Sequence, residues 1–251
     1  MFIIWLAVVF ACWGSFLNVL GFRLVRDQSI VFPNSYCPHC STPIAWYDNI
    51  PIISWLMLSG SCRNCKQAIS PLYPLIELFT AASLLFLWYQ IPLNYFFAYF
   101  IFFSALIVTI RSDLETFLIS RFATLFLIPV GIGCAYFELL PITTLESILG
   151  ALLGYGFLYI ISKLFYALRK IEGIGQGDLE LLAFIGAFTG IVGCWFTLLI
   201  SSILGLIIGL SYLLLSKQTI STRIPFGPFL ALSAMIFVLF QADIITFFFQ
   251  F

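Results

Sequence analysis

Apolar residues occupy most of this chain in long stretches, and short polar segments separate them. A helix needs about 20 apolar residues to cross the hydrocarbon core of a bilayer. The pattern predicts about eight transmembrane helices, the sixth of them short, at residues 1–22, 74–91, 95–111, 118–137, 144–167, 179–191, 194–215 and 226–248. The chain is therefore predicted to be an all-α polytopic membrane protein that lies in a lipid bilayer.

Composition supports this interpretation. Of the 251 residues, 62% are hydrophobic and 9% are charged, whereas soluble domains are about 45–50% apolar and about 25% charged. Eleven Lys and Arg balance eleven Asp and Glu, so net charge gives no indication of a nucleic-acid partner. The first stretch lacks a basic start and a small-residue cleavage site, and we expect it to be a retained helix rather than a signal peptide.

The basic residues predict an orientation. With eight crossings, all of them fall on one membrane face, whereas the loops near 92–94, 138–143 and 191–193 contain none. Basic residues concentrate on the cytoplasmic side of membrane proteins. The basic residues are Arg23, Arg26, Arg63, Lys66, Arg111, Arg121, Lys163, Arg169, Lys170, Lys217 and Arg223. We therefore expect their face to be cytoplasmic and both termini to lie outside.

One segment, at residues 23–73, is too polar to cross a membrane. It is the only sizeable stretch between predicted spans, and it follows the first predicted helix directly. The sequence thus predicts three parts: a first transmembrane helix at 1–22, a cytoplasmic zinc-binding segment at 23–73, and a transmembrane domain at 74–251.

The zinc prediction rests on two Cys-x-x-Cys pairs in that segment, Cys37 with Cys40 and Cys62 with Cys65. Four thiolates suit tetrahedral zinc, and the reducing cytoplasm disfavours disulfides. We expect one structural zinc ion on these four residues, with His39 as a bystander. Reduced cysteines without metal, or a redox pair, are the alternatives.

Carboxylates at the predicted membrane face are candidates for catalysis. Asp113 and Asp178 are expected at the cytoplasmic ends of their helices, with Glu115 and Glu180 nearby and Glu77 inside the second span. Two carboxylates close together share one proton, so one can activate a water while the other protonates the scissile carbonyl oxygen. The alternative is that each aspartate merely stabilises a helix end.

Several blocks of the sequence, in order, resemble the type IV prepilin peptidases, which are membrane aspartyl enzymes with a G-x-G-D motif. The blocks are Gly14 to Val19 with Arg23, Cys37 to Cys40, Ile44 to Trp55, Gly60 to Cys65, Ile69 to Glu77, Gly175 to Asp178, and Ile224 to Ala231. The resemblance covers most of the chain.

The resemblance implies an enzyme of the bacterial inner membrane that cleaves the leader peptide of prepilins and pseudopilins at the cytoplasmic face. It makes Asp113 and Asp178 the catalytic pair. It further implies methylation of the new N-terminus with S-adenosyl-L-methionine, although no cofactor-binding residue is assigned. The substrates among prepilins and the oligomeric state are left open.

Two positions depart from the family pattern. Ile119-Ser120-Arg121 stands where an Ile-Pro-Asp-like turn is usual, and Glu180 stands where a lysine is often found. The lost proline removes a fixed φ and a helix stop, which makes Glu115 the alternative to Asp113. An acid at position 180 would raise the pKa of nearby carboxylates instead of lowering it.

Two other functions are compatible with the sequence. One is a peptidase without methyltransferase activity, because the chain has no glycine-rich dinucleotide-binding motif. The other is a non-enzymatic membrane transporter or assembly scaffold that uses intramembrane acids as an ion path. Against the second, the acids gather at one face and not at the bilayer midplane.

Overall fold

A computed structural model describes the chain apart from residues 33, 172, 217–224 and 250–251. The described residues form helices and loops, with two isolated antiparallel bridges. The prediction of an all-α protein is therefore confirmed. The chain divides into two compact units, Met1–Gln90 and Ile91–Phe251.

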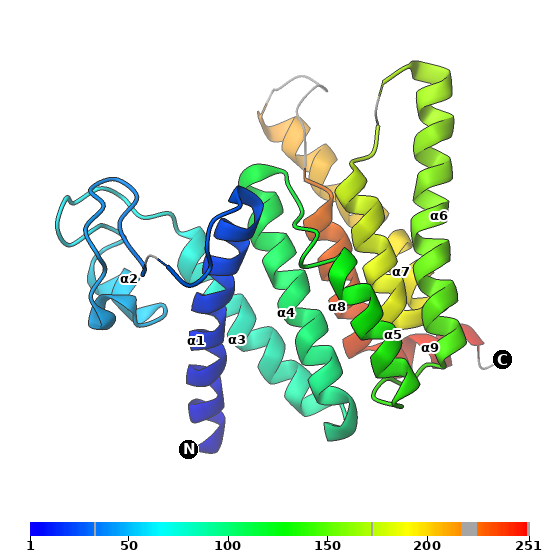
Figure 1. The fold of residues 1–251 in the computed structure, drawn as a ribbon, viewed down its shortest axis with the longest axis horizontal. Coiled ribbons are helices and arrows are strands. Elements are labelled where there is room, and N and C mark those ends of the chain that lie inside the picture. The colour runs from blue at the N-terminus through cyan, green and yellow to red at the C-terminus, as the bar shows by residue number, and fades with distance from the viewer. Residues whose placement is uncertain (33, 172, 217–224, 250–251) are drawn as a thin grey trace. The chain divides into compact units, whose positions relative to one another are not determined.

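In the first unit, helices α1 (Phe2–Arg23) and α3 (Leu72–Gln90) pack along each other (Figure 1). Gly14 lies at their crossing, where a Cβ atom would come within 2.9 Å of the Glu77 Cα. The Nδ2 atom of Asn18 donates a hydrogen bond of 3.1 Å to the carbonyl oxygen of Tyr73. A glycine and a short amide therefore allow the two backbones to approach closely.

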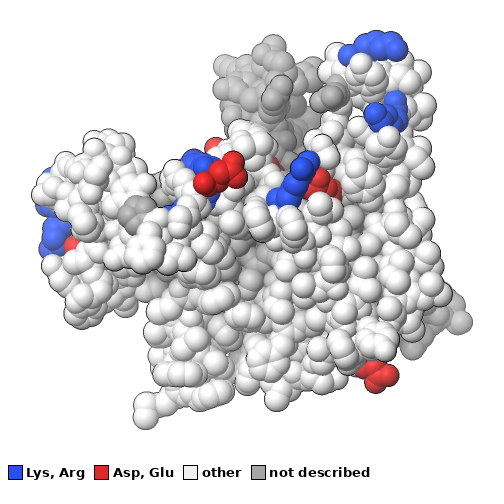
Figure 2. Space-filling model, in the orientation of Figure 1, with Lys and Arg blue, Asp and Glu red and all other residues white. Residues whose placement is uncertain are grey.

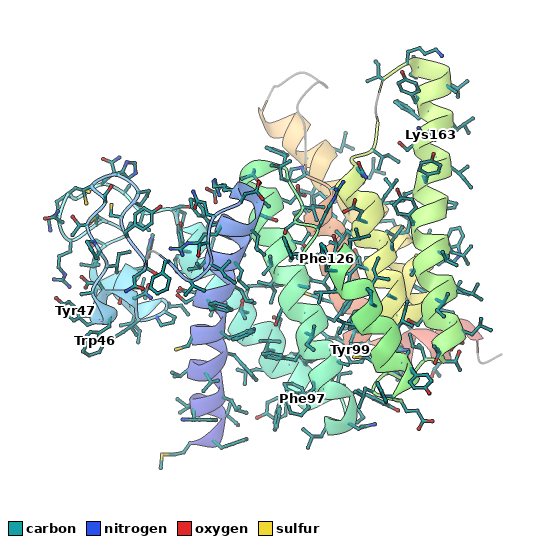
Figure 3. The ribbon with its side chains drawn as sticks, in the orientation of Figure 1. Trp46, Tyr47, Phe97, Tyr99, Phe126 and Lys163 are labelled. Atoms are coloured by element: carbon teal, nitrogen blue, oxygen red, sulfur yellow. The ribbon has the colours of Figure 1, made fainter. Side chains whose placement is uncertain are left out.

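The polar segment between these helices contains three short elements: η1 (Leu24–Arg26), η2 (Trp46–Asn49) and α2 (Ile53–Met57). The Arg63 guanidinium donates two hydrogen bonds, of 2.7 and 2.6 Å, to the Asp48 carboxylate. This pairing lowers the pKa of Asp48. Trp46 and Tyr47 project from this segment (Figure 3), and both rings are exposed.

The second unit contains the remaining helices. They are α4 (Leu93–Thr116), η3 (Leu125–Leu127), α5 (Ile128–Tyr136), α6 (Thr144–Arg169), α7 (Gln176–Ser216), α8 (Gly227–Leu239) and α9 (Gln241–Phe249). Every residue of α4 from Phe102 to Asp113 is buried. Its Tyr99 is buried whereas its Phe97 is exposed (Figure 3). Its Phe102 ring stacks on Phe188 of α7, with 4.9 Å between the centroids.

Helix α7 is broken at Gly190, which has φ 69° and ψ −170°. Glycine adopts this left-handed φ without steric cost. Figure 1 shows the yellow first part and the orange second part of α7 running in opposite directions. The predicted loop at 191–193 is therefore wrong in position, because the chain turns at Gly190 and is helical again at those residues.

Helix α6 crosses the first part of α7 backbone to backbone. A Cβ atom on Gly150 or on Gly186 would overlap the carbonyl oxygen of the other glycine. The hydroxyl of Ser147 donates a 2.6 Å hydrogen bond to the Ala187 carbonyl oxygen. Small residues at such a crossing are typical of helix pairs in membranes, where close packing replaces the hydrophobic effect.

Within the part of the chain that the structure describes, five helices are long and apolar enough to cross a membrane. They are Phe2–Arg26, Leu72–Gln90, Leu93–Thr116, Thr144–Arg169 and Gln176–Ser211. The apolar helices at Leu125–Tyr136 and Gly227–Leu239 are shorter. The structure therefore supports a polytopic chain with five candidate spans among the described residues, and the eight predicted spans are not confirmed.

Four predicted spans account for the difference. The span at 118–137 begins with an irregular stretch, because α4 ends at Thr116 and η3 starts only at Leu125. The spans at 179–191 and 194–215 are the two parts of α7. The last span, at 226–248, is divided into α8 and α9.

Candidate active site

Asp113 lies in the last turn of α4, where its side chain is 5% exposed. Its Oδ2 atom accepts a 3.0 Å hydrogen bond from the backbone N–H of Gly227, the first residue of α8. A Cβ atom at Gly227 would lie 2.7 Å from that oxygen. The N-terminus of α8 thus presents a donor and a positive dipole end to this carboxyl group, and a side chain at position 227 would have to displace the carboxyl group.

Asp178 lies in the first turn of α7, after Gly175-Gln176-Gly177. Its backbone N–H donates to the Gly175 carbonyl oxygen over 3.2 Å. A Cβ atom on Gly177 would lie 3.0 Å from the Cβ of Ile119, in the connection between α4 and α5. The glycine therefore lets this connection approach the start of α7 and brings the segment after Asp113 next to Asp178.

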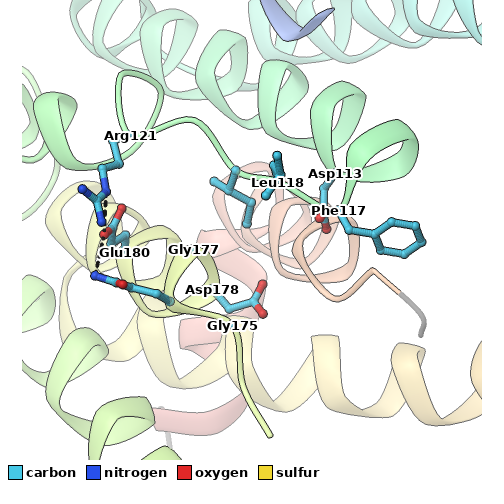
Figure 4. Close-up of a pocket in the computed structure, with 10 residues that line it drawn as sticks. Asp113, Phe117, Leu118, Arg121, Gly175, Gly177, Asp178 and Glu180 are labelled. Carbon is cyan, nitrogen blue, oxygen red and sulfur yellow. Dashed lines mark hydrogen bonds and ion pairs between the residues drawn. The ribbon is translucent and has the colours of Figure 1, made fainter. Parts of the chain in front are cut away.

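The two aspartates line one cavity of about 310 Å³. Figure 4 shows both side chains facing the same space, from the end of α4 and the start of α7. They are near enough for their charges to interact. The cavity is lined by Asp113, Phe117, Leu118, Ile119, Arg121, Gly175, Gln176, Gly177, Asp178 and Glu180. The structure therefore brings together the two aspartates on which the sequence analysis placed the chemistry.

Glu115, the alternative to Asp113, has a different environment. Its carboxylate forms an ion pair with Arg111, one turn earlier on α4, and the Arg111 side chain is buried. Glu115 is not among the described residues that line the cavity. Although the chain lacks the proline that is usual in this turn, α4 does not continue. Phe117 adopts a left-handed conformation with φ 56° and ends the helix.

Glu180 is buried beside the cavity and has two polar partners. Its Oε1 atom is 3.3 Å from Nε of Arg121 and 3.4 Å from Nε2 of Gln176 (Figure 4). Judged from the sequence, Glu180 and the turn that contains Arg121 are two separate departures from the family pattern. In the structure Glu180 and Arg121 form one ion pair.

The four cysteines converge within the first unit. Their sulfur atoms all lie within 4.8 Å of one another, and the Cys37 and Cys65 sulfurs are 3.8 Å apart. Zn–S bonds of about 2.3 Å in a tetrahedron place the sulfurs about 3.8 Å apart. His39 is exposed and does not belong to this cluster. The donor set and its spacing therefore fit a zinc ion.

The two Cys-x-x-Cys pairs have the same backbone geometry. The N–H of Ser41 donates to the Cys37 carbonyl oxygen over 2.8 Å, and the N–H of Lys66 donates to the Cys62 carbonyl oxygen over 3.0 Å. Ser41 and Lys66 both have left-handed φ, 56° and 59°. Each turn thereby directs its two sulfurs toward the same point.

The electrostatics of the cluster also favour a cation. Hydrogen bonding with Thr42 lowers the pKa of Cys40 to about 6. At Cys65 the N–H of Gln67 acts in the lowering direction, but burial and the three other sulfurs outweigh it and raise the pKa to about 11. The four sulfurs are thus too close to be thiolates together unless a positive ion neutralises them.

Comparison with known proteins gives two family matches along the chain. The family model described as "Bacterial Peptidase A24 N-terminal domain" matches residues 8–91, and the one described as "Type IV leader peptidase family" matches residues 100–210. The chain belongs to the type IV leader peptidase family. The first match spans the cysteine cluster, and the second spans Asp113 and Asp178.

Curated relatives of this leader peptidase family member support the assignment. "Prepilin leader peptidase/N-methyltransferase" of Aeromonas hydrophila is 36% identical over 84% of this chain and 73% of its own length. The enzyme of the same name from Pseudomonas aeruginosa is 32% identical over 95% of this chain and 90% of its own length. A "Type 4 prepilin-like proteins leader peptide-processing enzyme" of Escherichia coli O78:H11 is 33% identical, over 91% of this chain and 90% of its own length. No solved structure matches the chain.

Two residues near these sites were not assigned roles from the sequence. Gly227 lies in a block quoted for its resemblance, but nothing in its local sequence indicates a contact with Asp113. Glu77 was left without a role; it is buried, and it accepts a 2.7 Å hydrogen bond from the N–H of Ile52, whose φ is 62°. Glu77 therefore anchors the polar segment to α3.

Proposed function

We propose that this chain cleaves the leader peptide of type IV prepilins and pseudopilins, with Asp113 and Asp178 as the catalytic pair. The observation that carries the proposal is the single cavity that the two carboxyl groups line, at the adjoining ends of α4 and α7. The names of its relatives, which describe prepilin leader peptidases, support the substrate class.

In this proposal the pair works in the form that carries one proton. The ionised aspartate accepts a proton from a water molecule, and the protonated one donates to the scissile carbonyl oxygen as the water attacks. The resulting tetrahedral species then collapses, and a proton passes to the leaving amine. The N–H of Gly227 fixes the orientation of the Asp113 carboxyl group during these transfers.

The second activity in the proposal is N-methylation of the newly exposed amino group. Several relatives carry "N-methyltransferase" in their names. S-adenosyl-L-methionine would supply the methyl group, and no residue of this chain is assigned to binding it. We keep this activity separate from cleavage because a peptidase lacking it would retain the same aspartyl cavity.

Zinc has a structural role in the proposal. Cys37, Cys40, Cys62 and Cys65 together complete a tetrahedral shell, which leaves no position for a water molecule. The ion would therefore hold the polar segment in shape and take no part in peptide hydrolysis.

For topology we propose eight crossings in the bacterial inner membrane, with the aspartate cavity at the cytoplasmic face and both termini outside. In this topology α7 crosses the membrane twice, once with each of its two parts, and α8 and α9 together make one crossing. Neither α8 nor α9 is long enough to cross by itself. On the face drawn in Figure 2, the described Lys and Arg of the second unit lie toward the end where α6 finishes, which agrees with the positive-inside rule. Lys217 and Arg223 lie outside the described residues.

This topology predicts opposite locations for Ser41 and the C-terminus. A reporter fused after the last residue should be active on the side of the membrane away from the cytoplasm. A thiol reagent that cannot cross the membrane should fail to label a cysteine introduced by Ser41→Cys in intact cells. Detection of both positions on one side would contradict the eight crossings.

The proposed function is tested with the purified chain in detergent, a prepilin leader peptide and labelled S-adenosyl-L-methionine. We expect cleavage at one bond and transfer of the label to the new N-terminus. Cleavage without labelling would limit the function to peptidase activity. Absence of cleavage by folded protein would contradict the proposal and favour a transporter or scaffold.

A further inference from the structure

The ion pair between Arg121 and Glu180 joins the two segments that carry the aspartates. Arg121 belongs to the connection that follows Asp113, and Glu180 lies two residues after Asp178 in the first turn of α7. The two side chains meet with 3.3 Å between Nε and Oε1. This pair is therefore a direct link across the cavity wall.

The environments of the two side chains differ. The Glu180 side chain is 6% exposed, whereas that of Arg121 is 61% exposed. A buried carboxylate is costly unless it keeps its partner, and Arg121 supplies the only formal positive charge among the cavity-lining residues the structure describes. Reversal of either charge would therefore make the two side chains repel each other, and loss of the Arg121 charge would leave the buried carboxylate without its ion-pair partner.

The same two segments also touch through apolar atoms beside the ion pair. Ile119 packs closely against Gly177, where a Cβ atom would lie 3.0 Å from the Ile119 Cβ. Gln176 donates to Glu180 from within α7, which orients the carboxylate toward Arg121. The ion pair and the Ile119 contact thus hold one surface of α7 against the connection between α4 and α5.

We infer that Arg121 and Glu180 are a positioning pair, which fixes the connection after Asp113 against the start of α7 and thereby sets the separation of the two carboxyl groups. The inference rests on the proposed function. Because the two charged groups face each other with 3.3 Å between Nε and Oε1, their signs can be exchanged only at both positions together.

Charge exchange tests the inference. Arg121→Asp and Glu180→Lys each place two like charges face to face, and we expect each to lower kcat for leader cleavage at least about tenfold, with less change in KM. The double variant restores an attractive pair, and we expect kcat to recover to within about threefold of the unmodified chain. Arg169→Asp, an exposed charge reversal at the end of α6, is the control and should leave kcat unchanged.

Thermal unfolding in detergent gives the folded fraction of each variant, and each rate is divided by that fraction. A loss of folded protein is thereby separated from a loss of positioning. If a charge reversal prevents folding, a neutral cycle replaces it, with the variants Arg121→Gln, Glu180→Gln and the double variant. The kcat of the double variant should then be no lower than that of the slower single variant. Additive losses in either cycle, or single variants with unchanged kcat, would overturn the positioning role. Asp178→Asn is assayed in parallel. If Asp178→Asn still cleaves the leader peptide, the proposed function has failed. If Asp178→Asn is inactive and Arg121→Asp is fully active, the positioning role of Arg121 and Glu180 is refuted and the proposed function stands.

Discussion

Replacing Asp113 or Asp178 with Asn is expected to reduce leader cleavage by roughly 10³-fold or more, since acid and base catalysis contribute about 10²–10⁴-fold and each aspartate carries one of the two proton transfers. Asn has nearly the same shape but can neither accept nor donate the required proton. The pair acts as a unit, so the double variant should be little worse than either single one. Rates of peptide cleavage by purified, folded variants provide the measurement.

Glu115→Gln is the matched control for these variants, because Glu115 lies two residues from Asp113 on the same helix. Its carboxylate pairs with Arg111 and does not line the cavity. Near-normal cleavage is expected. Loss of cleavage in Glu115→Gln together with a near-normal rate in Asp113→Asn would transfer the catalytic assignment to Glu115.

The sequence predicts the long helices of this chain well. The span predicted at 144–167 becomes Thr144–Arg169, because its start is encoded locally. Thr143 and Glu146 form a capping box, with the Thr143 hydroxyl accepting from the Glu146 N–H and the Glu146 carboxylate accepting from the Thr143 N–H. Such signals lie within a few residues of each other, so the sequence alone is sufficient to read them.

Features that depend on distant residues were harder to predict. The break in α7 occurs at Gly190, but no charged residue marks it, and apolar character continues through both parts of the helix. The length of a hydrophobic stretch therefore gives the amount of membrane-compatible chain but not the point at which the chain turns. For the same reason the division of 226–248 into α8 and α9 was not predicted.

The candidate site was likewise predicted only in part. Asp113 and Asp178 were predicted to lie together because topology places both helix ends on one face, and the structure has them on one cavity. The Gly227 contact and the Arg121–Glu180 pair were not predicted. Each joins residues that are far apart along the chain, and neither leaves a periodic or local pattern.

The second large effect concerns the four cysteines. Cys62→Ser is expected to lower the zinc content from about one ion per chain to a small fraction, because serine is a poor zinc ligand and the cluster has four sulfurs for four positions. The apparent free energy of structural zinc binding is about 10–16 kcal/mol in zinc-finger peptides, which is more than a small polar segment gains from its own core. Metal analysis and limited proteolysis within residues 23–73 measure the loss.

Because the closed shell excludes a metal-bound water, the cysteine change should act on the shape of this segment and not on hydrolysis. We expect methylation and proteolytic resistance to fall more than cleavage in Cys62→Ser. Cys134→Ser, a cysteine in α5 outside the cluster, should retain zinc and both activities. Two results would contradict a structural zinc site: freshly purified, reduced protein without zinc, or cleavage that falls in proportion to zinc while the 23–73 segment keeps its resistance to proteolysis.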